Sequence, residues 1–292
     1  MVPHDGQRWA AKGSLESAAS CAAHVGQYEK AGIVVSNPPR PDNSERSNGA
    51  GADQRQGDAK LACILFDLDG TLIDTTDLIF RSYRHAYLAE LGEDLTDEAL
   101  FLGYGRPLPE AFTSILQYRQ VQQEPAARQP LIDRLITVYR EFNVSHHDVL
   151  AREFPGVQAT IHELRQRGYT LGLVTSKARG IAERGLKLIC LGDAFDAAIF
   201  MEDTELHKPH PDPLWAALDR LVLRHVAQQV LYVGDSTHDL QAGRAAGMQT
   251  AGALWGPFPP DSLKAEQPDY LLPSVSALLE LCPSRMSSIS GS

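Results

Sequence analysis

The sequence predicts an α/β fold in which a parallel sheet is covered by helices and carries an inserted helical domain. Three observations support this prediction. Short apolar runs recur along the chain without the polar alternation of half-exposed strands, and segments of helical periodicity separate them. About a hundred residues separate the first run from the second, far more than one crossover helix needs. Repeated strand–helix–strand units are typical of a doubly wound α/β domain.

Five apolar runs are the expected strands, and each is continuous enough to be buried on both faces. In chain order they are 62–66 (ACILF), 171–174 (LGLV), 197–200 (AAIF), 230–233 (VLYV) and 250–254 (TAGAL). Strands of this kind are typical of a parallel sheet with helices on its two faces.

Helical periodicity fills the intervals between the later strands. Apolar residues at positions i, i+4 and i+7 predict a helix over 157–164. A second helix is expected over 212–222, where an aspartate cap is followed by a proline at the first helical position. A third is expected over 237–247, where a glycine ends it.

The long interval after the first strand predicts a helical cap domain over 80–150. Helical apolar patterns cover 78–91, 111–118 and 131–142. Turn residues separate these patterns at 103–107 and near Pro125. The α/β core is therefore expected to consist of two segments, 59–79 and 151–283.

The first 58 residues are predicted to be a disordered extension and linker without an assigned function. Only six of them are Leu, Ile, Val or Phe, which is about half of the share below which disorder is expected. They also lack the apolar stretch of a secretory signal. A flexible tail is expected over 284–292.

Composition excludes several classes of partner. The net charge of −10 and the pI of about 5.4 argue against nucleic-acid binding, which requires a basic surface. No window approaches the run of about 20 apolar residues that crosses a bilayer, so we expect a soluble protein without a membrane partner. Four scattered cysteines favour a reducing compartment and a cytoplasmic location. Nothing in the sequence predicts the oligomeric state.

Polar residues follow the expected strands at the edge where open α/β sheets bind ligands. Asp67 and Asp69 follow the first strand, and Thr175 follows the second. Lys208 comes after the third strand and Asp235 after the fourth. Two carboxylates about 4 Å apart repel by roughly 4 kcal/mol at an effective dielectric constant of about 20. We therefore expect a hard divalent cation, Mg²⁺, among these oxygen ligands.

Four motifs, FDLDGTL, VTSK, KPHPD and VGDSTHD, occur in this order at the ends of these strands. They resemble the motifs of the haloacid dehalogenase-like (HAD) phosphohydrolase superfamily. Longer stretches such as YREFNVSHHDVL are similar to the branch of phosphoglycolate phosphatases and HAD-type inorganic pyrophosphatases. The resemblance covers about residues 60–282. It implies a Rossmann-like sheet of strand order 5-4-1-2-3 with a helical cap inserted after the first motif.

The resemblance also implies roles for the acidic residues. Asp67 would be the nucleophile that forms an aspartyl-phosphate, and Asp69 would be the general acid and base. Mg²⁺ would be held by the Asp67 carboxylate, the backbone carbonyl of Asp69 and the Asp235 carboxylate. Asp239 would order the water molecules bound to the metal.

The resemblance implies three further residues in substrate binding, and the expected cap loop adds a fourth candidate. Thr175 would donate its hydroxyl to the transferring phosphoryl group, and Ser176 would donate its backbone N–H. Lys208 would pair with both the phosphate and Asp67. Arg106, on the expected cap loop, would contact the substrate; an arginine on the open surface is the alternative.

Each of these residues taken singly has an ordinary explanation as a turn former, a helix cap or a solvated loop residue. Their conjunction at one sheet edge favours an Mg²⁺-dependent phosphohydrolase that acts on inorganic pyrophosphate or a small phosphate monoester. Phosphoglycolate phosphatase and phosphosugar phosphatase or mutase activity are the alternatives. A haloacid dehalogenase, which would lack the second aspartate, and a non-catalytic binding module are less favoured.

Overall fold

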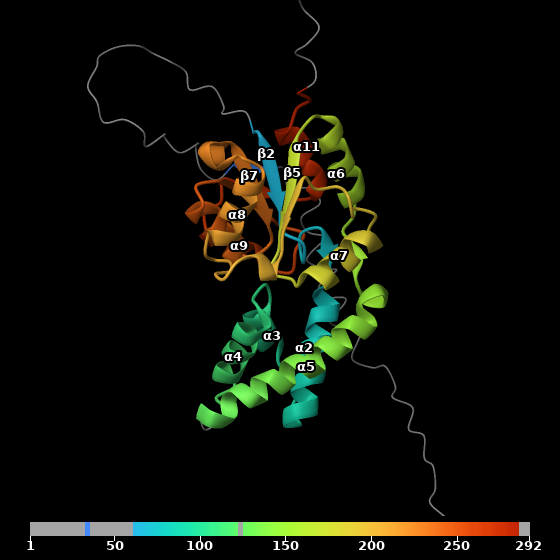
Figure 1. Cartoon of the computed structure of the whole chain (residues 1–292), viewed down its shortest axis with the longest axis vertical. Coiled ribbons are helices and arrows are strands. Elements are labelled where there is room, and N and C mark those ends of the chain that lie inside the picture. Colours follow the sequence, from blue (N-terminus) through green and yellow to red (C-terminus); the bar gives the residue numbers. More distant parts are fainter. Residues whose placement is uncertain (1–32, 36–60, 122–124, 286–292) are drawn as a thin grey trace, which may run out of the picture.

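The computed structural model describes residues 33–35, 61–121 and 125–285. Figure 1 shows a sheet flanked by helices, with a second group of helices beyond one end of the sheet. Apart from 33–35, the extension expected over residues 1–58 lies outside the described residues, and so does most of the expected tail.

A seven-stranded sheet forms the centre of the protein, in the order β1-β9-β8-β7-β2-β5-β6. Its strands are β1 (Val34–Val35), β2 (Cys63–Phe66), β5 (Thr170–Val174), β6 (Ala197–Ile199), β7 (Val230–Gly234), β8 (Gln249–Ala253) and β9 (Tyr270–Leu272). The five predicted strands correspond to β2, β5, β6, β7 and β8. The parallel pairs of the sheet are β6–β5, β5–β2, β2–β7, β7–β8 and β8–β9. The predicted strand order 5-4-1-2-3 is therefore confirmed.

Two strands extend the sheet beyond the prediction. Strand β9 adds to β8, and β1 then pairs antiparallel with β9, with Val34 opposite Leu271. The expectation of disorder over residues 1–58 does not hold for Val34 and Val35. Their apolar sequence meets the edge of β9, and an open sheet edge offers unpaired backbone groups to any strand that can reach it.

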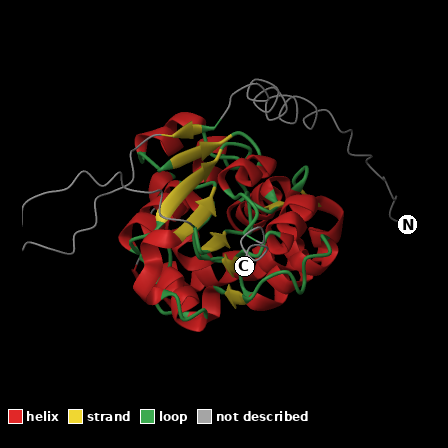
Figure 2. Cartoon of the chain, turned by 90° about the horizontal axis from the view of Figure 1, so that it is seen from above, coloured by secondary structure: helices red, strands yellow, loops and turns green. Residues whose placement is uncertain are grey.

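Helices cover both faces of the sheet, as Figure 2 shows from above. Ile64 and Phe66 of β2 belong to the core beneath α6 (Val157–Gln166), α7 (Arg179–Leu188) and α11 (Leu278–Leu281). Cys63 and Leu65 point to the opposite core, which packs against α8 (Asp212–Arg220) and α9 (Thr237–Ala245). Because successive side chains of a strand alternate between faces, an apolar run without polar interruptions can serve both cores.

A separate helical core lies beyond the sheet and is built on α2 (Thr76–Leu91), α3 (Asp97–Gly103), α4 (Leu108–Tyr118) and α5 (Pro125–Leu150). The helical patterns predicted from the sequence fall in α2, α4 and α5. Helix α3 was not predicted, because it is only seven residues long. Its N-cap is Thr96, whose side chain accepts a hydrogen bond from the N–H of Ala99.

Two short segments join the helical core to the sheet. Strand β3 (Ile73–Asp74) pairs antiparallel with β4 (Arg152–Glu153), so the chain leaves and re-enters the α/β part at one place. The remaining described helices are α10 (Pro260–Ala265) and the 3₁₀ turns η1 (Met201–Asp203), η2 (Arg224–Gln229) and η3 (Val275–Ala277). None of the described helices combines the length and the apolar character required to cross a membrane.

Candidate active site

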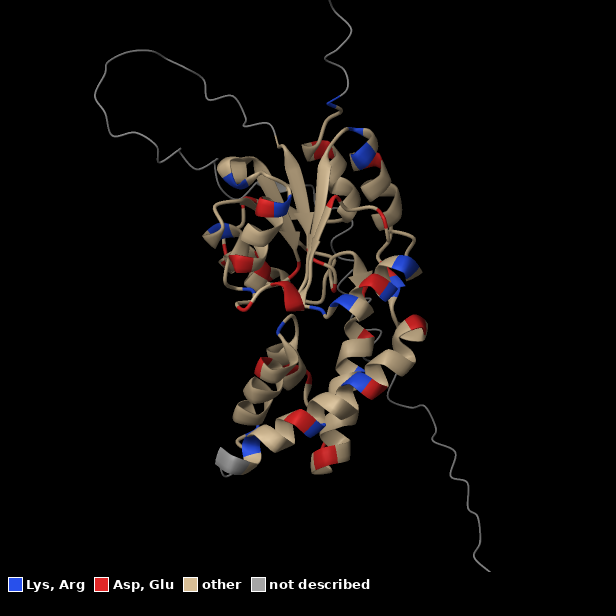
Figure 3. Ribbon diagram, in the orientation of Figure 1, with Lys and Arg blue, Asp and Glu red and all other residues tan. Residues whose placement is uncertain are grey.

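The candidate site lies where neighbouring parallel strands end together. The register places Phe66 of β2 beside Leu173 of β5 and Val233 of β7. Asp67, which follows Phe66, donates its backbone N–H to the carbonyl oxygen of Val233 at 2.9 Å. Asp235 follows the last residue of β7, so the two aspartates leave the sheet side by side. Figure 3 shows acidic and basic positions gathered at this end of the sheet, facing the helical core.

Three buried carboxylates converge there. Oxygen atoms of Asp67, Asp235 and Asp239 lie within 4.8 Å of one another. Asp239 comes from the first turn of α9, where Ser236 is the N-cap. Ser236 donates its N–H to Asp239 Oδ2 at 3.1 Å, and Ser236 Oγ accepts the N–H of Asp239 at 3.2 Å. This reciprocal cap fixes the Asp239 side chain and satisfies two backbone donors at the start of the helix.

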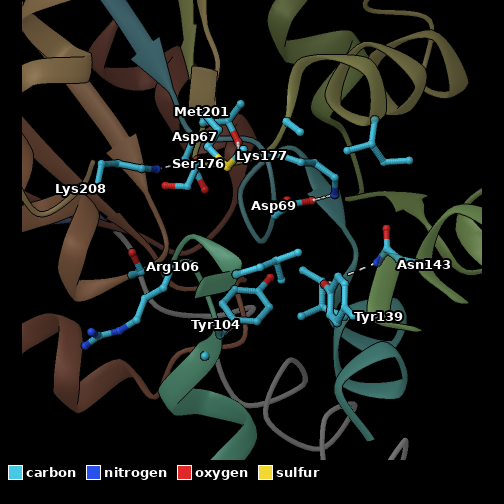
Figure 4. Close-up of a pocket in the computed structure, with 18 of the residues that line it drawn as sticks. Asp67, Asp69, Tyr104, Arg106, Tyr139, Asn143, Ser176, Lys177, Met201 and Lys208 are labelled. Atoms are coloured by element: carbon cyan, nitrogen blue, oxygen red, sulfur yellow. Dashed lines mark hydrogen bonds and ion pairs between the residues drawn. The ribbon is translucent and has the colours of Figure 1, made fainter. Parts of the chain in front are cut away.

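Lys208 supplies the positive charge inside this cluster. Its Nζ atom donates to Asp67 Oδ1 at 2.7 Å and to Asp239 Oδ1 at 2.6 Å. The hydroxyl of Tyr232 lies 3.1 Å from the same nitrogen. Because all of these groups are buried, water screens the attraction less than it would at the surface. Figure 4 shows the Lys208 side chain directed at Asp67.

The electrostatic balance of the cluster is unfavourable for three ionised carboxylates. Burial raises the pKa of Asp67 to about 7, although Lys208 acts in the opposite direction. Burial also raises the pKa of Asp235 well above its usual range, and the charges of Asp239 and Asp67 add to this effect. Burial would raise the pKa of Asp239 as well, but the charge of Lys208 and the hydrogen bonds from Lys208, Ser236 and Tyr232 together outweigh it and lower that pKa. One lysine therefore does not balance the three acids.

The residues present fit a divalent cation. Asp235 accepts a hydrogen bond from Thr71 Oγ1 at 3.0 Å through Oδ1, whereas its buried Oδ2 has no hydrogen-bond partner among the described residues. A buried oxygen without a partner is costly unless another group binds it. The available donors are carboxylate oxygens, the ligand type that hard divalent cations prefer. This fit rests on the orphaned oxygen and on the surplus of negative charge around it.

Asp69 lies at a different place from the three clustered carboxylates. Its Oδ1 atom accepts hydrogen bonds from Thr75 Oγ1 and from Lys177 Nζ, both at 2.6 Å. The side chains of Asp69 and Lys177 are 18% and 10% exposed, so the pair is partly shielded from water. Neither Lys177 nor Thr75 was among the predicted site residues. The available signal was position, since Lys177 stands two residues after Thr175 at the end of a central strand.

A cavity of about 300 Å³ opens between the strand ends and the helical core. Asp67, Asp69, Asp235, Asp239 and Lys208 line one side of it. The opposite wall comes from the helical core and is largely apolar or aromatic. This wall includes Ile79, Tyr83, Tyr104, Leu108 and Tyr139. The predicted acidic residues and Lys208 therefore line the same cavity as side chains of the inserted helices.

The other predicted binding residues also line the cavity. Thr175 is buried, and its Oγ1 accepts the N–H of Lys177 at 3.1 Å, which leaves its hydroxyl hydrogen free to donate elsewhere. Ser176 Oγ is buried without a hydrogen-bond partner among the described residues. Arg106 lies on the wall, but its guanidinium group points away from Asp67 and Lys208 in Figure 4.

Comparison with known proteins gives a consistent set of relatives. A family profile described as haloacid dehalogenase-like hydrolase matches residues 64–253. Pyrophosphatase PpaX of Bacillus cereus (strain Q1) is 37% identical over 222 residues, which are 76% of this chain and 96% of that protein. Pyrophosphatase PpaX of Anoxybacillus flavithermus is 38% identical over 218 residues, which are 75% of this chain and 95% of that protein.

Solved structures share the fold. A crystal structure from Bacteroides fragilis, described as a haloacid dehalogenase-like hydrolase, has a TM-score of 0.67 and 26% sequence identity. The comparison covers 75% of this chain and 100% of that chain. A haloacid dehalogenase-like protein from Streptococcus pneumoniae has a TM-score of 0.63 and 24% identity, covering 76% of this chain and 98% of that chain.

Proposed function

Because this chain belongs to the haloacid dehalogenase-like hydrolase family and is a hydrolase of phosphate bonds, we propose that its substrate is inorganic pyrophosphate. The similarity to the PpaX pyrophosphatases supports this substrate, since it extends over nearly their whole length. The observation that carries the reaction is the buried Asp67 carboxylate, 2.7 Å from Lys208 Nζ. A nucleophile and a fixed positive charge are combined where a phosphoryl group would bind.

The proposed reaction has two steps. A carboxylate oxygen of Asp67 attacks phosphorus, the bond from phosphorus to the bridging oxygen breaks, and Asp69 gives its proton to that oxygen. Asp69 then accepts a proton from water as the water oxygen attacks the aspartyl-phosphate, which restores the Asp67 carboxylate and releases phosphate. Thr175, the N–H of Ser176 and Lys208 would hold the phosphoryl oxygens, with the donors fixed before the reaction begins.

We propose Mg²⁺ as the cofactor, because it accepts carboxylate ligands and retains positions for water and phosphate oxygens. The carboxylates of Asp67 and Asp235 and the backbone carbonyl of Asp69 would hold it. Asp239 would orient water bound to it. When bound, the ion supplies positive charge that reduces repulsion between the carboxylates and the phosphate. The orphaned Oδ2 of Asp235 supports this assignment.

The helical segment 80–150 is proposed to act as a cap over the α/β core. Its apolar wall would exclude water from the phosphoryl group, and its loop would carry Arg106 to the substrate. Since the guanidinium of Arg106 points away from Asp67 and Lys208 in Figure 4, contact would require its side chain to turn inward. A cytoplasmic location is also proposed, because the scattered cysteines suit a reducing compartment.

The substrate proposal is tested by steady-state kinetics of the full chain with Mg²⁺. We expect kcat/KM for pyrophosphate to exceed that for 2-phosphoglycolate and for glucose 1-phosphate by at least about tenfold. Asp67→Asn provides the blank for contaminating hydrolases. A higher kcat/KM for either organic phosphate would overturn pyrophosphate as the substrate while leaving the phosphohydrolase chemistry intact.

A phosphate monoester is the second candidate, and the cavity wall favours it. Pyrophosphate carries no apolar group, whereas Ile79, Leu108 and Tyr139 present apolar surface opposite the acidic cluster. Burial of a carbon-containing leaving group against this wall would contribute about 25 cal/mol per Å². Leu108→Asn, which removes apolar surface without adding charge, should therefore impair hydrolysis of an organic phosphate more strongly than hydrolysis of pyrophosphate.

A further inference from the structure

Lys177 occupies a distinctive position among the cations that line the cavity. Its Nζ atom lies 2.6 Å from Asp69 Oδ1, and Figure 4 shows the two side chains joined on the side of the cavity away from Lys208. Lys208 is already bound to Asp67 and Asp239. The guanidinium group of Arg106 points away from Asp67 and Lys208 in Figure 4. Arg140 also lines the cavity, but among the described residues the cation that forms an ion pair with Asp69, the proposed general acid, is Lys177.

The ammonium group of Lys177 has donors to spare. An ammonium carries three N–H donors, and the contact to Asp69 Oδ1 uses one of them. The side chain lines the cavity and is 10% exposed, so its remaining donors lie at the edge of the substrate space. Thr75 also donates to Asp69 Oδ1. With Oδ1 held by two donors, Asp69 Oδ2 is the oxygen available to transfer a proton.

A group that accepts a proton from Asp69 must lie within hydrogen-bond distance of this carboxyl, and therefore close to Lys177 as well. When the leaving group is phosphate, its terminal oxygens are anionic, and the Asp69 carboxyl becomes anionic after it gives up its proton. Two anions would then face each other. When the leaving group is a neutral alcohol, Asp69 is the only new anion at that place.

We propose that Lys177 binds the departing phosphate and thereby selects phosphoanhydrides over phosphate esters. This inference rests on the proposed pyrophosphatase function and adds the residue that receives the leaving group. The bridging oxygen leaves phosphorus with the bonding electron pair and takes the proton from Asp69. Lys177 donates to a terminal oxygen of the departing phosphate while it remains beside Asp69, so that one ammonium offsets both anions.

The alternative is that Lys177 only holds the Asp69 carboxyl in place. The two roles differ in their substrate dependence. A positioning residue affects every reaction in which Asp69 transfers a proton, whatever the charge of the leaving group. A residue that binds the departing phosphate affects pyrophosphate hydrolysis more strongly than hydrolysis of an ester with a neutral leaving group.

The test compares Lys177→Gln with the wild-type chain, in the presence of Mg²⁺, on pyrophosphate and on phenyl phosphate. Loss of a charge-assisted hydrogen bond weakens binding by about ten- to hundredfold. We expect kcat/KM for pyrophosphate to fall at least about tenfold further than kcat/KM for phenyl phosphate. Equal losses on the two substrates, or no loss on pyrophosphate, would overturn the proposal. Lys177→Arg should recover part of the pyrophosphate activity, because the positive charge is restored.

Inhibition by methylenediphosphonate provides a readout that needs no ester turnover. This non-hydrolysable analogue keeps two linked phosphoryl groups, so its inhibition constant should rise about tenfold or more in Lys177→Gln. An unchanged inhibition constant would contradict the proposal. Lys187→Gln is the matched control, because Lys187 is an exposed lysine of α7 outside the cavity. Lys187→Gln should hydrolyse pyrophosphate and phenyl phosphate at the rates of the wild type.

The design separates failure of this inference from failure of the proposed function. If the wild-type chain hydrolyses phenyl phosphate but not pyrophosphate, the substrate proposal is wrong and the role of Lys177 falls with it. If the wild-type chain hydrolyses pyrophosphate and Lys177→Gln loses both activities equally, pyrophosphatase function stands and the specificity role of Lys177 is rejected.

Discussion

Gly70 faces Asp235 so closely that a β-carbon on Gly70 would lie 2.3 Å from Asp235 Oδ2. Gly70 also has a φ angle of +85°, which side chains rarely adopt. The glycine of the first motif therefore serves two purposes. It allows the turn after Asp69, and it leaves room for the carboxylate that we propose as a metal ligand.

We expect Gly70→Ala to lower kcat/KM at least about tenfold and to weaken activation by Mg²⁺, because the new methyl group displaces the Asp235 carboxylate. Titration of activity with Mg²⁺ measures the effect. Gly92→Ala is the matched control, since Gly92 has a φ of +71° and open space around it. That control should lose about 1–3 kcal/mol of unfolding free energy from backbone strain and keep its activity. Equal activity losses in the two variants would contradict the steric argument.

Asp67→Asn should reduce kcat by at least about 10³-fold, because an amide is a poor nucleophile and cannot form the acyl phosphate. Single-turnover assays with ³²P-pyrophosphate provide the direct measurement: the wild-type chain should yield an acid-stable, base-labile phosphoprotein, and the variant should not. Labelling of the variant at wild-type level would place the nucleophile on another residue.

Lys208→Met should lower kcat by about 10²–10³-fold, since it removes a fixed cation from the phosphoryl site. It should also reduce the free energy of unfolding by about 3–5 kcal/mol, because Asp67 and Asp239 lose the buried partner that they share. Urea denaturation at pH 7 measures the stability. Tyr232→Phe removes an uncharged hydroxyl that contacts Lys208, Asp239 Oδ1 and the carbonyl oxygen of Val174, and it should cost about 1–3 kcal/mol. A smaller loss for Lys208→Met than for Tyr232→Phe would refute this electrostatic account.

Metal binding can be followed without turnover. Mg²⁺ should raise the midpoint of thermal unfolding by binding only the folded chain, and EDTA should reverse the rise. Asp235→Asn should abolish the shift, because it removes the carboxylate whose Oδ2 has no partner among the described residues. Asp261→Asn, at an exposed position on α10, is the control and should keep the full shift. If Mg²⁺ raised the unfolding midpoint of Asp235→Asn as much as that of the wild type, the metal would bind at another site.

His147 on α5 should make stability depend on pH. Burial is the main cause that lowers its pKa, so the folded chain favours the neutral imidazole. In the unfolded chain the group protonates near pH 6.5. The stabilising contribution of the neutral imidazole to the free energy of unfolding is therefore fully present above about pH 7. It is lost as the pH falls through the lower pKa of the folded state. Between pH 8 and pH 5, wild-type protein should lose more unfolding free energy than His147→Gln. A larger loss of unfolding free energy in His147→Gln than in the wild type would contradict a lowered pKa of His147.

Much of the fold was predictable because its signals are local. The run Cys63–Phe66 is apolar at consecutive positions, and a short run of this kind that ends at turn residues is typical of a strand buried on both faces. The short elements were missed for the same reason. Helix α3 has seven residues and β1 has two, too few for a periodicity to stand out. Their existence depends on a cap or on an open sheet edge nearby.

The sequence by itself determined the α/β class and the acidic residues at the strand ends, and the family that its motifs resemble implied the strand order. The tertiary structure decided which charges meet. Lys177 contacts Asp69 across 108 positions of the chain, and Lys208 joins Asp67 and Asp239 from a third loop. Periodicity places a residue on an element, whereas the distance between two side chains also depends on loop geometry and side-chain rotamers, which no local pattern records.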